Sequence, residues 1–600
     1  MTRALALVED GVATLALLAM VVLPLLEIVL RRLFGVGVPA SGPIVQHLTL
    51  WVGFLGAAIA ARDGKLLALA SGTFIPEGRF RRASEVYSAA VAAGIGTILA
   101  WGGVELVLSE RGTGSTLGAG IPIWVAQTVL PIGFALIAVR QVWRVRSGWS
   151  GRAIAGLGIV AGVIIMRAPG LLEGRTPLPG LLIVLLAGVV GTPIFVLLGG
   201  AAVLLFMSEG VTPAAVLIET YQLSVSPTLP AIPLFTLAGF LLAEGNASAR
   251  LLRVFRAWFG WIPGGTAVVC AFLCSFFTVF TGGSGVTILA LGGVLFPALL
   301  KDGYRERFAL GLMTAAGSLG LLLPPALPLI LYGVVAQIPI EDLFIGGILP
   351  GILLTTMIAA WGVREGIISG AGRQPFVFRE SLVSLWVAKW ELAMPFVVLV
   401  AMFSGIATAV EAAALVALYA LVVQTVVHRD LSIRRDLLRV FTECAVVVGG
   451  VLVILGVAVG FTNYLVGAEI PAKMLAWSQQ NIHSKFLFLL MLNLFLLAVG
   501  WLMEIFAAIV VVVPLIVPLG EAFGIHPVHL GIIFIANLEL GFLTPLVGIN
   551  IFLASYRFKR PVLEVARAAL PMMAILGLGV LLITYVPWLT LAILRMLGRA

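Results

Sequence analysis

The stretch Gly320-Leu-Leu-Leu-Pro324 decides the architecture of this chain, because a related stretch, Gly541-Phe-Leu-Thr-Pro545, follows it 221 positions later. Each lies within a hydrophobic run, where its glycine and proline would interrupt a membrane helix. Further pairs keep nearly the same spacing: Pro297 with Pro518, Gly239-Phe240 with Gly460-Phe461, and Gly311 with Gly531. We infer that the chain contains two related halves, each with a broken helix.

The composition places the chain in a bilayer. It is 61% hydrophobic and 11% charged, with a mean hydropathy of +1.14, which leaves too little polar surface for a water-soluble globule. Most of its apolar runs approach the length of about 20 residues that crosses the hydrocarbon, and they predict about fifteen or sixteen spanning or re-entrant segments. The predicted fold class is an all-α polytopic membrane protein.

The first 150 residues read as four helices with basic residues in two clusters. One cluster lies between the second and third helices and includes Arg62, Arg81 and Arg82, and the other follows the fourth helix and includes Arg144 and Arg146. Such clusters favour the cytoplasmic side and put the N-terminus inside the cell. The net charge of +9 is spread over short loops, so it is expected to orient helices rather than to bind nucleic acid.

The breaker-rich segment that follows is the best domain boundary in the chain. We predict a small four-helix domain over 1–150, a linking helix and loop over 151–180, and a large domain over 181–600. Within the large domain the two repeats are expected at about 181–370 and 385–600. Paired Gly/Pro-interrupted segments in two halves are the sequence signature of a secondary transporter's binding site.

The segment Thr281-Gly-Gly-Ser-Gly-Val-Thr287 interrupts an otherwise apolar run in the first half. Three glycines disfavour a continuous helix, so we predict the tip of a re-entrant hairpin. Irregular backbone at membrane depth exposes carbonyl and hydroxyl oxygens, which are the ligands that hard cations such as Na⁺ prefer. The alternative is close helix packing through small residues.

The next element, from Gly311 to Tyr332, contains Gly317-Ser-Leu-Gly320 and then Pro324-Pro325. Proline donates no backbone hydrogen bond, so the carbonyls one turn earlier are free to face a ligand. We predict an unwound helix. A simple proline kink is the alternative.

The second half repeats this plan with different chemistry. Glu504 stands where the first half has Gly283, and an ionisable residue at such depth marks a functional site, where it could hold a cation or carry a proton. A carboxylate at a helix end near the interface is the alternative. The matching broken helix supplies a dense polar set, in which Asn550 could instead bond a neighbouring helix. This set is Asn537, Glu539, Thr544, Gly548 and Asn550.

Other polar residues receive simpler interpretations. The three cysteines lie in or beside apolar runs and are expected to be buried free thiols. Glu411 is expected to serve packing or a polar tether, and the histidines are expected mostly near loops. The chain contains no G-x-x-x-x-G-K-[ST], H-E-x-x-H or G-x-S-x-G motif, so nothing in it indicates an ATP-driven pump, a protease or another enzyme of these kinds.

At these residues the chain resembles the membrane component of tripartite ATP-independent periplasmic (TRAP) transporters, in the form that fuses the small and large subunits. The similarity is carried by Pro233-Leu-Phe-Thr-Leu-Ala-Gly239, the Thr281 tip, the double proline of the first broken helix, and Gly541-x-Leu-Thr-Pro545-x-Val-Gly548-x-Asn550. It is specific over 181–600. Over 1–150 it rests on helix number and the basic loops.

The resemblance implies a sodium-coupled importer of the bacterial inner membrane that works by an elevator motion. A soluble periplasmic binding protein would deliver the substrate, usually a small organic acid. One sodium site would comprise Thr281, Gly282, Gly283, Ser284 and Gly285 with Ser318, Gly320 and Pro324. The other would comprise Glu504, Gly541, Thr544, Pro545 and Gly548. Thr287, Asn537 and Asn550 are candidates for substrate contact.

Three departures from the family pattern change the expected ligands: the first tip has fewer hydroxyls, Glu504 replaces a common aspartate, and Leu546 replaces a second proline. Other functions compatible with the sequence are a stand-alone ion-coupled carboxylate transporter and, from a different class, a channel or membrane scaffold. Four extra N-terminal helices argue against the first. Polar residues confined to two tips argue against a channel, and Glu504 and Asn550 at depth argue against a scaffold. The sequence does not choose between a monomer and a homo-oligomer, and it identifies no particular acid.

Overall fold

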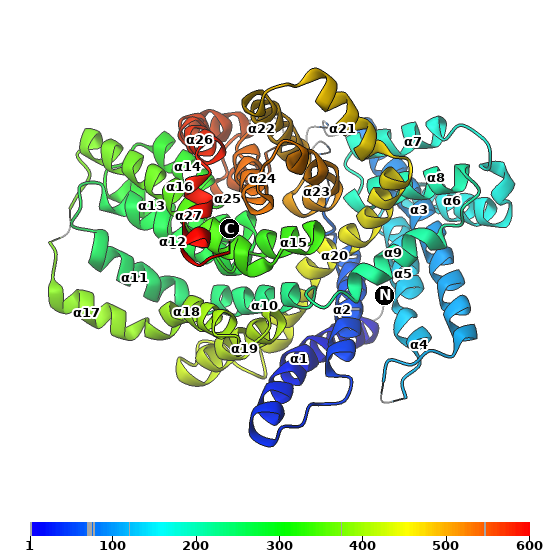
Figure 1. Cartoon of the computed structure of the whole chain (residues 1–600), viewed down its shortest axis with the longest axis horizontal. Coiled ribbons are helices and arrows are strands. Elements are labelled where there is room, and N and C mark those ends of the chain that lie inside the picture. The colour runs from blue at the N-terminus through cyan, green and yellow to red at the C-terminus, as the bar shows by residue number, and fades with distance from the viewer. Residues whose placement is uncertain are drawn as a thin grey trace. The chain divides into compact units, whose positions relative to one another are not determined.

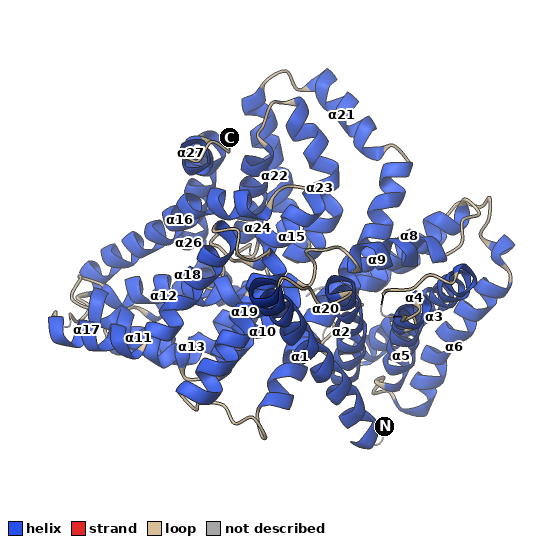
Figure 2. Cartoon of the chain, turned by 60° about the horizontal axis from the view of Figure 1, so that its bottom comes forward, coloured by secondary structure: helices blue, strands red, loops and turns tan. Residues whose placement is uncertain are grey.

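The computed structural model is built of helices joined by short loops (Figures 1 and 2). It describes the chain except residues 1–2, 69–71, 73–74, 76–77, 119, 374, 545–547 and 600, and for residues 3–5 and Leu502 it describes the backbone alone. Eleven helices in the described part are long and apolar enough to cross a membrane, or up to 13 if each of two bent pairs forms one span. The all-α polytopic fold class is therefore confirmed.

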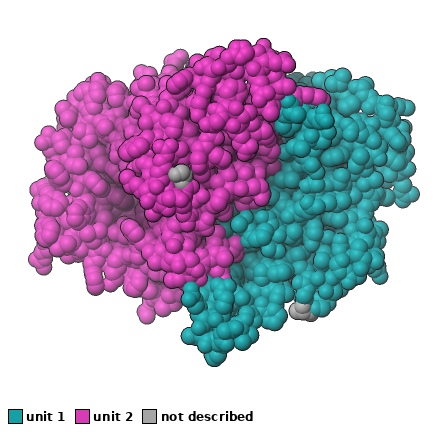
Figure 3. Space-filling model, viewed as in Figure 1, with its two compact units in different colours: residues 1–234, 434–472 teal, residues 235–433, 473–600 magenta. Residues whose placement is uncertain are grey.

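The chain divides into two compact units (Figure 3). Unit 1 comprises residues 1–234 and 434–472, and unit 2 comprises residues 235–433 and 473–600. This division does not follow the domain boundaries predicted at 150 and 180, because part of the predicted second repeat folds with the N-terminal helices. Those domains stay a prediction.

Unit 1 begins with the four predicted N-terminal helices, of which the fourth is formed by two segments in sequence. Their bounds are α1 Arg3–Phe34, α2 Ser41–Asp63, α3 Arg79–Thr113, and α4 Ile123–Gln127 with α5 Val129–Trp143. The remaining helices are α6 Gly148–Arg167, η2 Pro169–Leu171, α7 Leu178–Val189, α8 Ile194–Ser208, α9 Ala214–Ser224 and α20 Leu437–Gly467. The predicted linking segment is thus a 20-residue helix, α6, long enough to span. The long helix α20 packs against α2, α8 and α9 and forms the centre of the unit.

Unit 2 holds both predicted hairpins. The first half contains α10 Ala231–Glu244, which begins in unit 1, α11 Ala247–Phe259, α12 Gly265–Thr281, α13 Ser284–Lys301, α14 Glu306–Ala316, α15 Leu327–Ala336 and α16 Ile340–Ser369. Between the halves lie α17 Phe378–Val387, α18 Lys389–Phe403, α19 Ala409–Val422 and the π-helical turn η3 Val423–Val427. The second half contains α21 Ile470–Asn481, which begins in unit 1, α22 Lys485–Leu502, α23 Ile505–Ala522, α24 Pro527–Gly541, α25 Ile549–Phe558, α26 Val562–Tyr585 and α27 Trp588–Met596.

Helix ends reproduce the spacing found in the sequence. The first arms of the two hairpins, α12 and α22, end at Thr281 and Leu502, and the second arms, α13 and α23, end at Lys301 and Ala522. Each pair of ends is 221 positions apart. The predicted internal repeat is therefore present as two copies of a hairpin followed by a broken helix.

Several simpler interpretations are also settled. The three cysteines are buried and free, as expected. Glu411 forms a capping box with Thr408, whose backbone N–H donates to the Glu411 carboxylate at 2.8 Å, so the polar tether is confirmed. One histidine departs from the expectation of a loop position: His529 lies buried in α24, where it bonds the Thr590 hydroxyl at 3.1 Å and the Thr584 carbonyl oxygen at 3.2 Å.

Candidate functional site

The first predicted tip is a two-residue reversal between α12 and α13. Gly282 adopts a φ of +62°, in the left-handed region that favours glycine, and its N–H donates to the Thr278 carbonyl at 2.9 Å. Gly283 is extended and caps α13. The hairpin is thus confirmed in place of a continuous helix packed through small residues.

Three threonine hydroxyls gather behind this tip. The Thr278 Oγ1 lies 2.8 Å from the Thr287 Oγ1 and 2.8 Å from the Gly317 carbonyl oxygen, and the Thr281 Oγ1 lies 3.3 Å from the Thr287 Oγ1. All three side chains are buried. A hydroxyl has one hydrogen and two lone pairs, so the cluster presents more acceptor positions than its own donors fill. Sequence reasoning did not single out Thr278; its spacing of three from Thr281 on one helix face was the available signal.

The first broken helix is unwound rather than kinked. Between the end of α14 at Ala316 and the start of α15 at Leu327, the remaining backbone bonds connect residues three apart, as from the Leu321 N–H to the Ser318 carbonyl at 3.0 Å. The Ser318 hydroxyl donates to the Ala315 carbonyl at 3.2 Å. Carbonyls of this segment therefore lack their helical partners, as predicted.

Gly320 allows this unwound segment to lie in direct contact with the hairpin. A Cβ at this position would lie 2.2 Å from the Ser275 carbonyl oxygen and 2.8 Å from the Val279 nitrogen, both backbone atoms of α12. Only glycine allows two backbones to approach so closely. Pro324, by contrast, lines a largely apolar cavity of about 330 Å³ with residues of α11, α12, α16 and α18, and none of the three threonines lines that cavity.

The second tip consists of Met503 and Glu504. Glu504 caps α23, and its carboxylate accepts the Phe506 N–H at 3.1 Å. It holds the same place in its hairpin as Gly283 holds in the first, as the sequence offset predicts. A carboxylate at a helix N-terminus is favoured by the helix dipole, and capping one N–H leaves acceptor capacity for a cation.

The second broken helix lies against its own hairpin at Gly541. A Cβ on Gly541 would lie 2.7 Å from the Cα of Gly500 in α22, so the two backbones touch. Beyond α24, the Thr544 hydroxyl donates to the Gly541 carbonyl at 2.6 Å, and the Gly548 N–H donates to the Thr544 carbonyl at 3.1 Å. Pro545 lies outside the described residues, as does the Leu546 departure.

Asn537 and Asn550 have different surroundings. Asn537 donates to the Asn493 side-chain oxygen at 2.6 Å, and that oxygen also accepts from the Thr584 hydroxyl at 3.1 Å, so Asn537 ties α24 to α22 and α26. Asn550 in α25 donates to the Thr314 carbonyl of α14 at 3.3 Å. The helix–helix bond considered for Asn550 is therefore present, and it joins the second repeat to the first.

The helix that follows each break, α15 or α25, packs against the hairpin of the other repeat. α25 of the second repeat packs on α13 of the first hairpin, where Leu553 would meet a Cβ added at Gly285 at 2.6 Å. α15 of the first repeat packs on α23 of the second hairpin. Each hairpin is therefore packed against the start of its own broken helix and the end of the other. The two predicted ion sites and the space between them belong to one packed assembly within unit 2.

Glu539 stands out among the residues to which sequence reasoning gave no role. It is 1% exposed, and neither carboxylate oxygen has a hydrogen-bond partner in the described part of the chain. It lies on α24 between Asn537 and Gly541, inside the second broken helix. A buried carboxylate without partners is costly, so Glu539 is a further candidate for binding a cation or a proton.

The donor set at both tips fits a hard monovalent cation. No group of three or more His, Cys, Asp or Glu side chains gathers among the described residues. The oxygen atoms brought together belong instead to carbonyls, hydroxyls and single carboxylates. Such ligands suit ions like Na⁺ rather than soft transition metals.

Paired hairpins and broken helices within an apolar helical bundle define a secondary transporter. The DctM component model of the tripartite ATP-independent periplasmic transporters matches residues 180–589, and the DctQ component model of the same transporters matches residues 20–151. The chain belongs to this family and joins both components in one polypeptide.

Relatives carry different substrates according to their names. The chain is 31% identical over 559 residues to the isethionate TRAP transporter permease protein DctMQ of Oleidesulfovibrio alaskensis, covering 91% of this chain and 87% of that protein. It is 33% identical over 403 residues to the C4-dicarboxylate TRAP transporter large permease protein DctM of Pseudomonas aeruginosa, covering 67% and 94%. The ectoine TRAP transporter large permease protein TeaC of Halomonas elongata is 30% identical over 405 residues, covering 67% and 95%.

Among solved structures, the Alcanivorax borkumensis YdaH transporter matches with a TM-score of 0.40 at 18% identity, covering 60% of this chain and 84% of that one. This score is too low to support an argument about the fold.

Proposed function

We propose that this chain is the membrane part of a sodium-coupled importer that takes up a small organic acid from a periplasmic binding protein. The observation that carries the proposal is the pairing of each hairpin tip with an unwound helix. At the first tip this pairing brings the Thr278 hydroxyl to the Gly317 carbonyl, with the Thr287 hydroxyl against that of Thr278. These are oxygen ligands of the kind a sodium ion takes.

The first site would use Thr281 to Gly285 with Ser318 and Gly320, and the second Glu504, Gly541, Thr544 and Gly548. Thr278 is added to the first set on the strength of its contacts. Pro324 is less suited, because it faces the apolar cavity. Thr287 belongs with the ion ligands as much as with the substrate, and Asn537 is engaged in tying helices together.

The substrate class rests on the relatives. Isethionate and C4-dicarboxylates, named in two of them, are organic acid anions, whereas ectoine carries both charges. An anionic substrate would bind between the tips, near sodium ions that offset its charge. Because the exchanged half-helices pack both tips into one assembly, they would move together in an elevator step that carries ions and substrate across the membrane.

The test is uptake by proteoliposomes that contain the purified chain, with a periplasmic binding protein encoded beside its gene and that protein's radiolabelled ligand. We expect uptake only with an inward sodium gradient and only with the binding protein present. Uptake unchanged after the gradient is collapsed overturns sodium coupling. Uptake without the soluble protein favours the stand-alone carboxylate transporter instead. Cysteine labelling near Arg3 in intact cells tests the proposed inner-membrane orientation, in which the N-terminus is cytoplasmic.

A further inference from the structure

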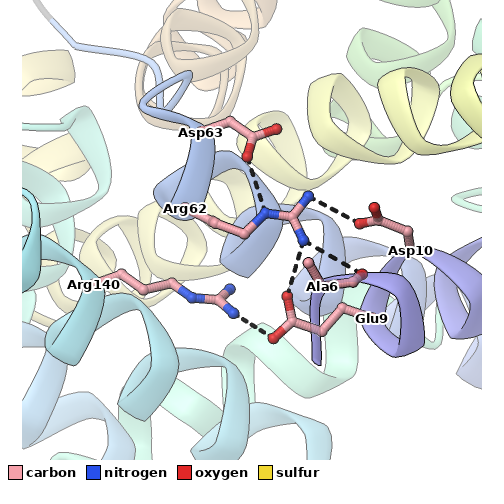
Figure 4. A network of polar contacts seen from close by, with 6 residues as sticks. All are labelled: Ala6, Glu9, Asp10, Arg62, Asp63 and Arg140. Atoms are coloured by element: carbon pink, nitrogen blue, oxygen red, sulfur yellow. Dashed lines mark hydrogen bonds and ion pairs between the residues drawn. The ribbon is translucent and has the colours of Figure 1, made fainter. Parts of the chain in front are cut away.

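The basic residues of unit 1 fall into two structurally different groups. Arg62 and Arg140 belong to a closed network, in which Arg62 pairs with Asp10 at 2.9 Å and with Asp63 at 2.9 Å, and Glu9 bridges Arg62 and Arg140 (Figure 4). Their charges are already balanced within the protein. Arg81, Arg144 and Arg146 lie elsewhere and line a cavity of about 300 Å³ together with Glu85, Ser88 and Gln141.

The walls of this cavity are fixed by packing and hydrogen bonds. The first wall is the start of α3, and the second is the end of α5 with the turn that follows it. Val145 of this turn packs with Ala89 of α3 and Ala155 of α6 in a small buried cluster. The third wall, at Val190 and Gly191, is held by the Thr192 hydroxyl, which donates to the Ser88 Oγ at 2.8 Å. The cavity is therefore a built feature of unit 1 rather than a gap between mobile loops.

The cavity carries an excess of positive charge. Three arginines line it against one carboxylate, Glu85, which lies 3.8 Å from Arg81. Neither Arg144 nor Arg146 has a carboxylate within ion-pair distance in the described part of the chain. Partial burial and the neighbouring Arg146 charge lower the pKa of Arg144, although the Asp63 carboxylate acts in the opposite direction. An anion held between these two guanidinium groups would relieve their repulsion.

Aromatic residues place the cavity at the level of lipid headgroups. Trp143 ends α5 and is 56% exposed, and Trp149 begins α6 and is 78% exposed. The Arg152 guanidinium lies over both rings, 5.2 Å from the Trp143 centroid and 5.8 Å from the Trp149 centroid. Exposed tryptophans at the ends of spanning helices mark the membrane–water interface. The anion nearest to this cavity is thus the phosphate of a phospholipid.

We propose that this pocket binds the phosphate of an anionic phospholipid headgroup, held by the guanidinium groups of Arg144 and Arg146 with Arg81 across the cavity. Arginine matches phosphate because its planar fork donates two parallel hydrogen bonds. A volume of about 300 Å³ is at the lower end of small-molecule pockets and suits a headgroup rather than a whole lipid. Basic pockets of this kind on the cytoplasmic side bind anionic lipid headgroups.

The experiment measures lipid retention by native mass spectrometry of the full chain, purified from nanodiscs of phosphatidylcholine containing phosphatidylglycerol or cardiolipin. The test variant is Arg144→Gln/Arg146→Gln. Both side chains are exposed, so the fold should survive. The matched control is Arg82→Gln. Arg82 is exposed and lies next to Arg81 at the start of α3, but it does not line the cavity. With about fivefold in affinity per arginine near an anionic surface, we expect roughly 30-fold weaker retention in the double variant and a change of no more than about fivefold in the control.

A second arm separates the lipid from free phosphate. Thermal unfolding of the chain in neutral detergent is followed with added inorganic phosphate, and separately with added short-chain phosphatidylglycerol. We expect a rise in the unfolding temperature with the lipid, lost in Arg144→Gln/Arg146→Gln. If the unfolding temperature rises with inorganic phosphate but not with phosphatidylglycerol, the assignment to a lipid is overturned. Equal lipid retention by the double variant and by Arg82→Gln overturns the site itself.

Discussion

Replacing Gly320 with alanine tests whether the unwound segment must touch the first hairpin. The added Cβ would lie 2.2 Å from the Ser275 carbonyl oxygen, 2.8 Å from the Val279 nitrogen and 2.8 Å from the Thr278 Cβ. Ordinary van der Waals contact begins near 3.4 Å, so the two backbones must separate by about 1 Å. No flexible side chain end can yield instead, since the atoms belong to the helix backbone or sit next to it.

This displacement acts on the ion site directly. The Thr278 hydroxyl meets the Gly317 carbonyl at 2.8 Å, three residues from the substitution, and it also contacts the Thr287 hydroxyl at 2.8 Å. A shift of about 1 Å breaks such contacts. A misplacement of this size in a functional site costs about 100-fold in rate, while the overpacking itself costs about 1–3 kcal/mol of stability. We therefore expect sodium-driven uptake to fall by about 100-fold in protein that still folds.

The assay is the initial rate of sodium-driven uptake by proteoliposomes, with the unfolding temperature of the same preparation in detergent. Gly283→Ala is the matched control at the tip of the same hairpin, because a Cβ there has no neighbour closer than 3.9 Å and alanine keeps the backbone carbonyl, the only ligand that Gly283 could offer. We expect the control to stay within about twofold of wild type. An uptake rate for Gly320→Ala equal to that of the control would refute the reasoning.

Three further predictions follow from charged side chains in unit 2. Glu504→Gln keeps an acceptor for the Phe506 N–H but removes the charge, so the sodium concentration for half-maximal uptake should rise by at least about tenfold. Glu504→Asp keeps the charge and should retain most of the affinity for sodium. Equal sodium dependence in the two variants would contradict a role of Glu504 in ion binding. Arg250→Met removes the arginine that lies 2.7 Å from the fully buried Glu391 and 2.8 Å from Asp430, and should cost about 3–5 kcal/mol in chemical unfolding. Arg250→Met/Glu391→Leu should regain only the part that is due to Glu391, because Asp430 still lacks its arginine; no recovery would argue against the buried-charge explanation. Burial disfavours the ionised form of Asp430, but hydrogen bonds from Arg250 and Asn246 outweigh the effect of burial and lower the pKa of this carboxyl. Ionised Asp430 therefore stabilises the fold above the ordinary pKa of about 3.9, and this stabilisation is lost as the pH falls through the lower pKa of the folded state. The unfolding temperature of Asp430→Asn should accordingly decline less than that of wild type between pH 5 and pH 3, and parallel declines would show that Asp430 does not contribute.

The spacing of breakers was enough to predict the local plan of unit 2. Glycine and proline act within one turn of their own position, so the tip at Gly282 and Gly283 and the break after Ala316 follow from the sequence alone. The constant offset then placed Glu504 at the second tip. These features depend on short-range backbone chemistry, which a single sequence carries.

Contacts between distant segments were not predictable in the same way. Asn550 was a candidate for substrate contact or for a bond to a neighbouring helix, and the sequence did not identify which helix. It bonds Thr314 of the first half, because packing of α25 on α13 and α14 decides which surface it faces. Thr278 was not singled out, and Glu539 was named only within a polar set, for the same reason: the surroundings of a threonine in an apolar helix or of a glutamate near a break depend on the segment opposite. His529 was grouped with the histidines expected near loops; it lies in the first turn of α24, where packing against Thr584 and Thr590 buries it.

The exchange of half-helices between the repeats makes the two copies mutually dependent. Neither hairpin is complete within its own half of the polypeptide, since α25 covers the first and α15 covers the second. A protein cut between the repeats would leave each fragment with an apolar hairpin face that only the other fragment can shield. The two halves therefore depend on each other for a complete assembly, although their tips differ in chemistry, with Gly283 in the first where Glu504 stands in the second.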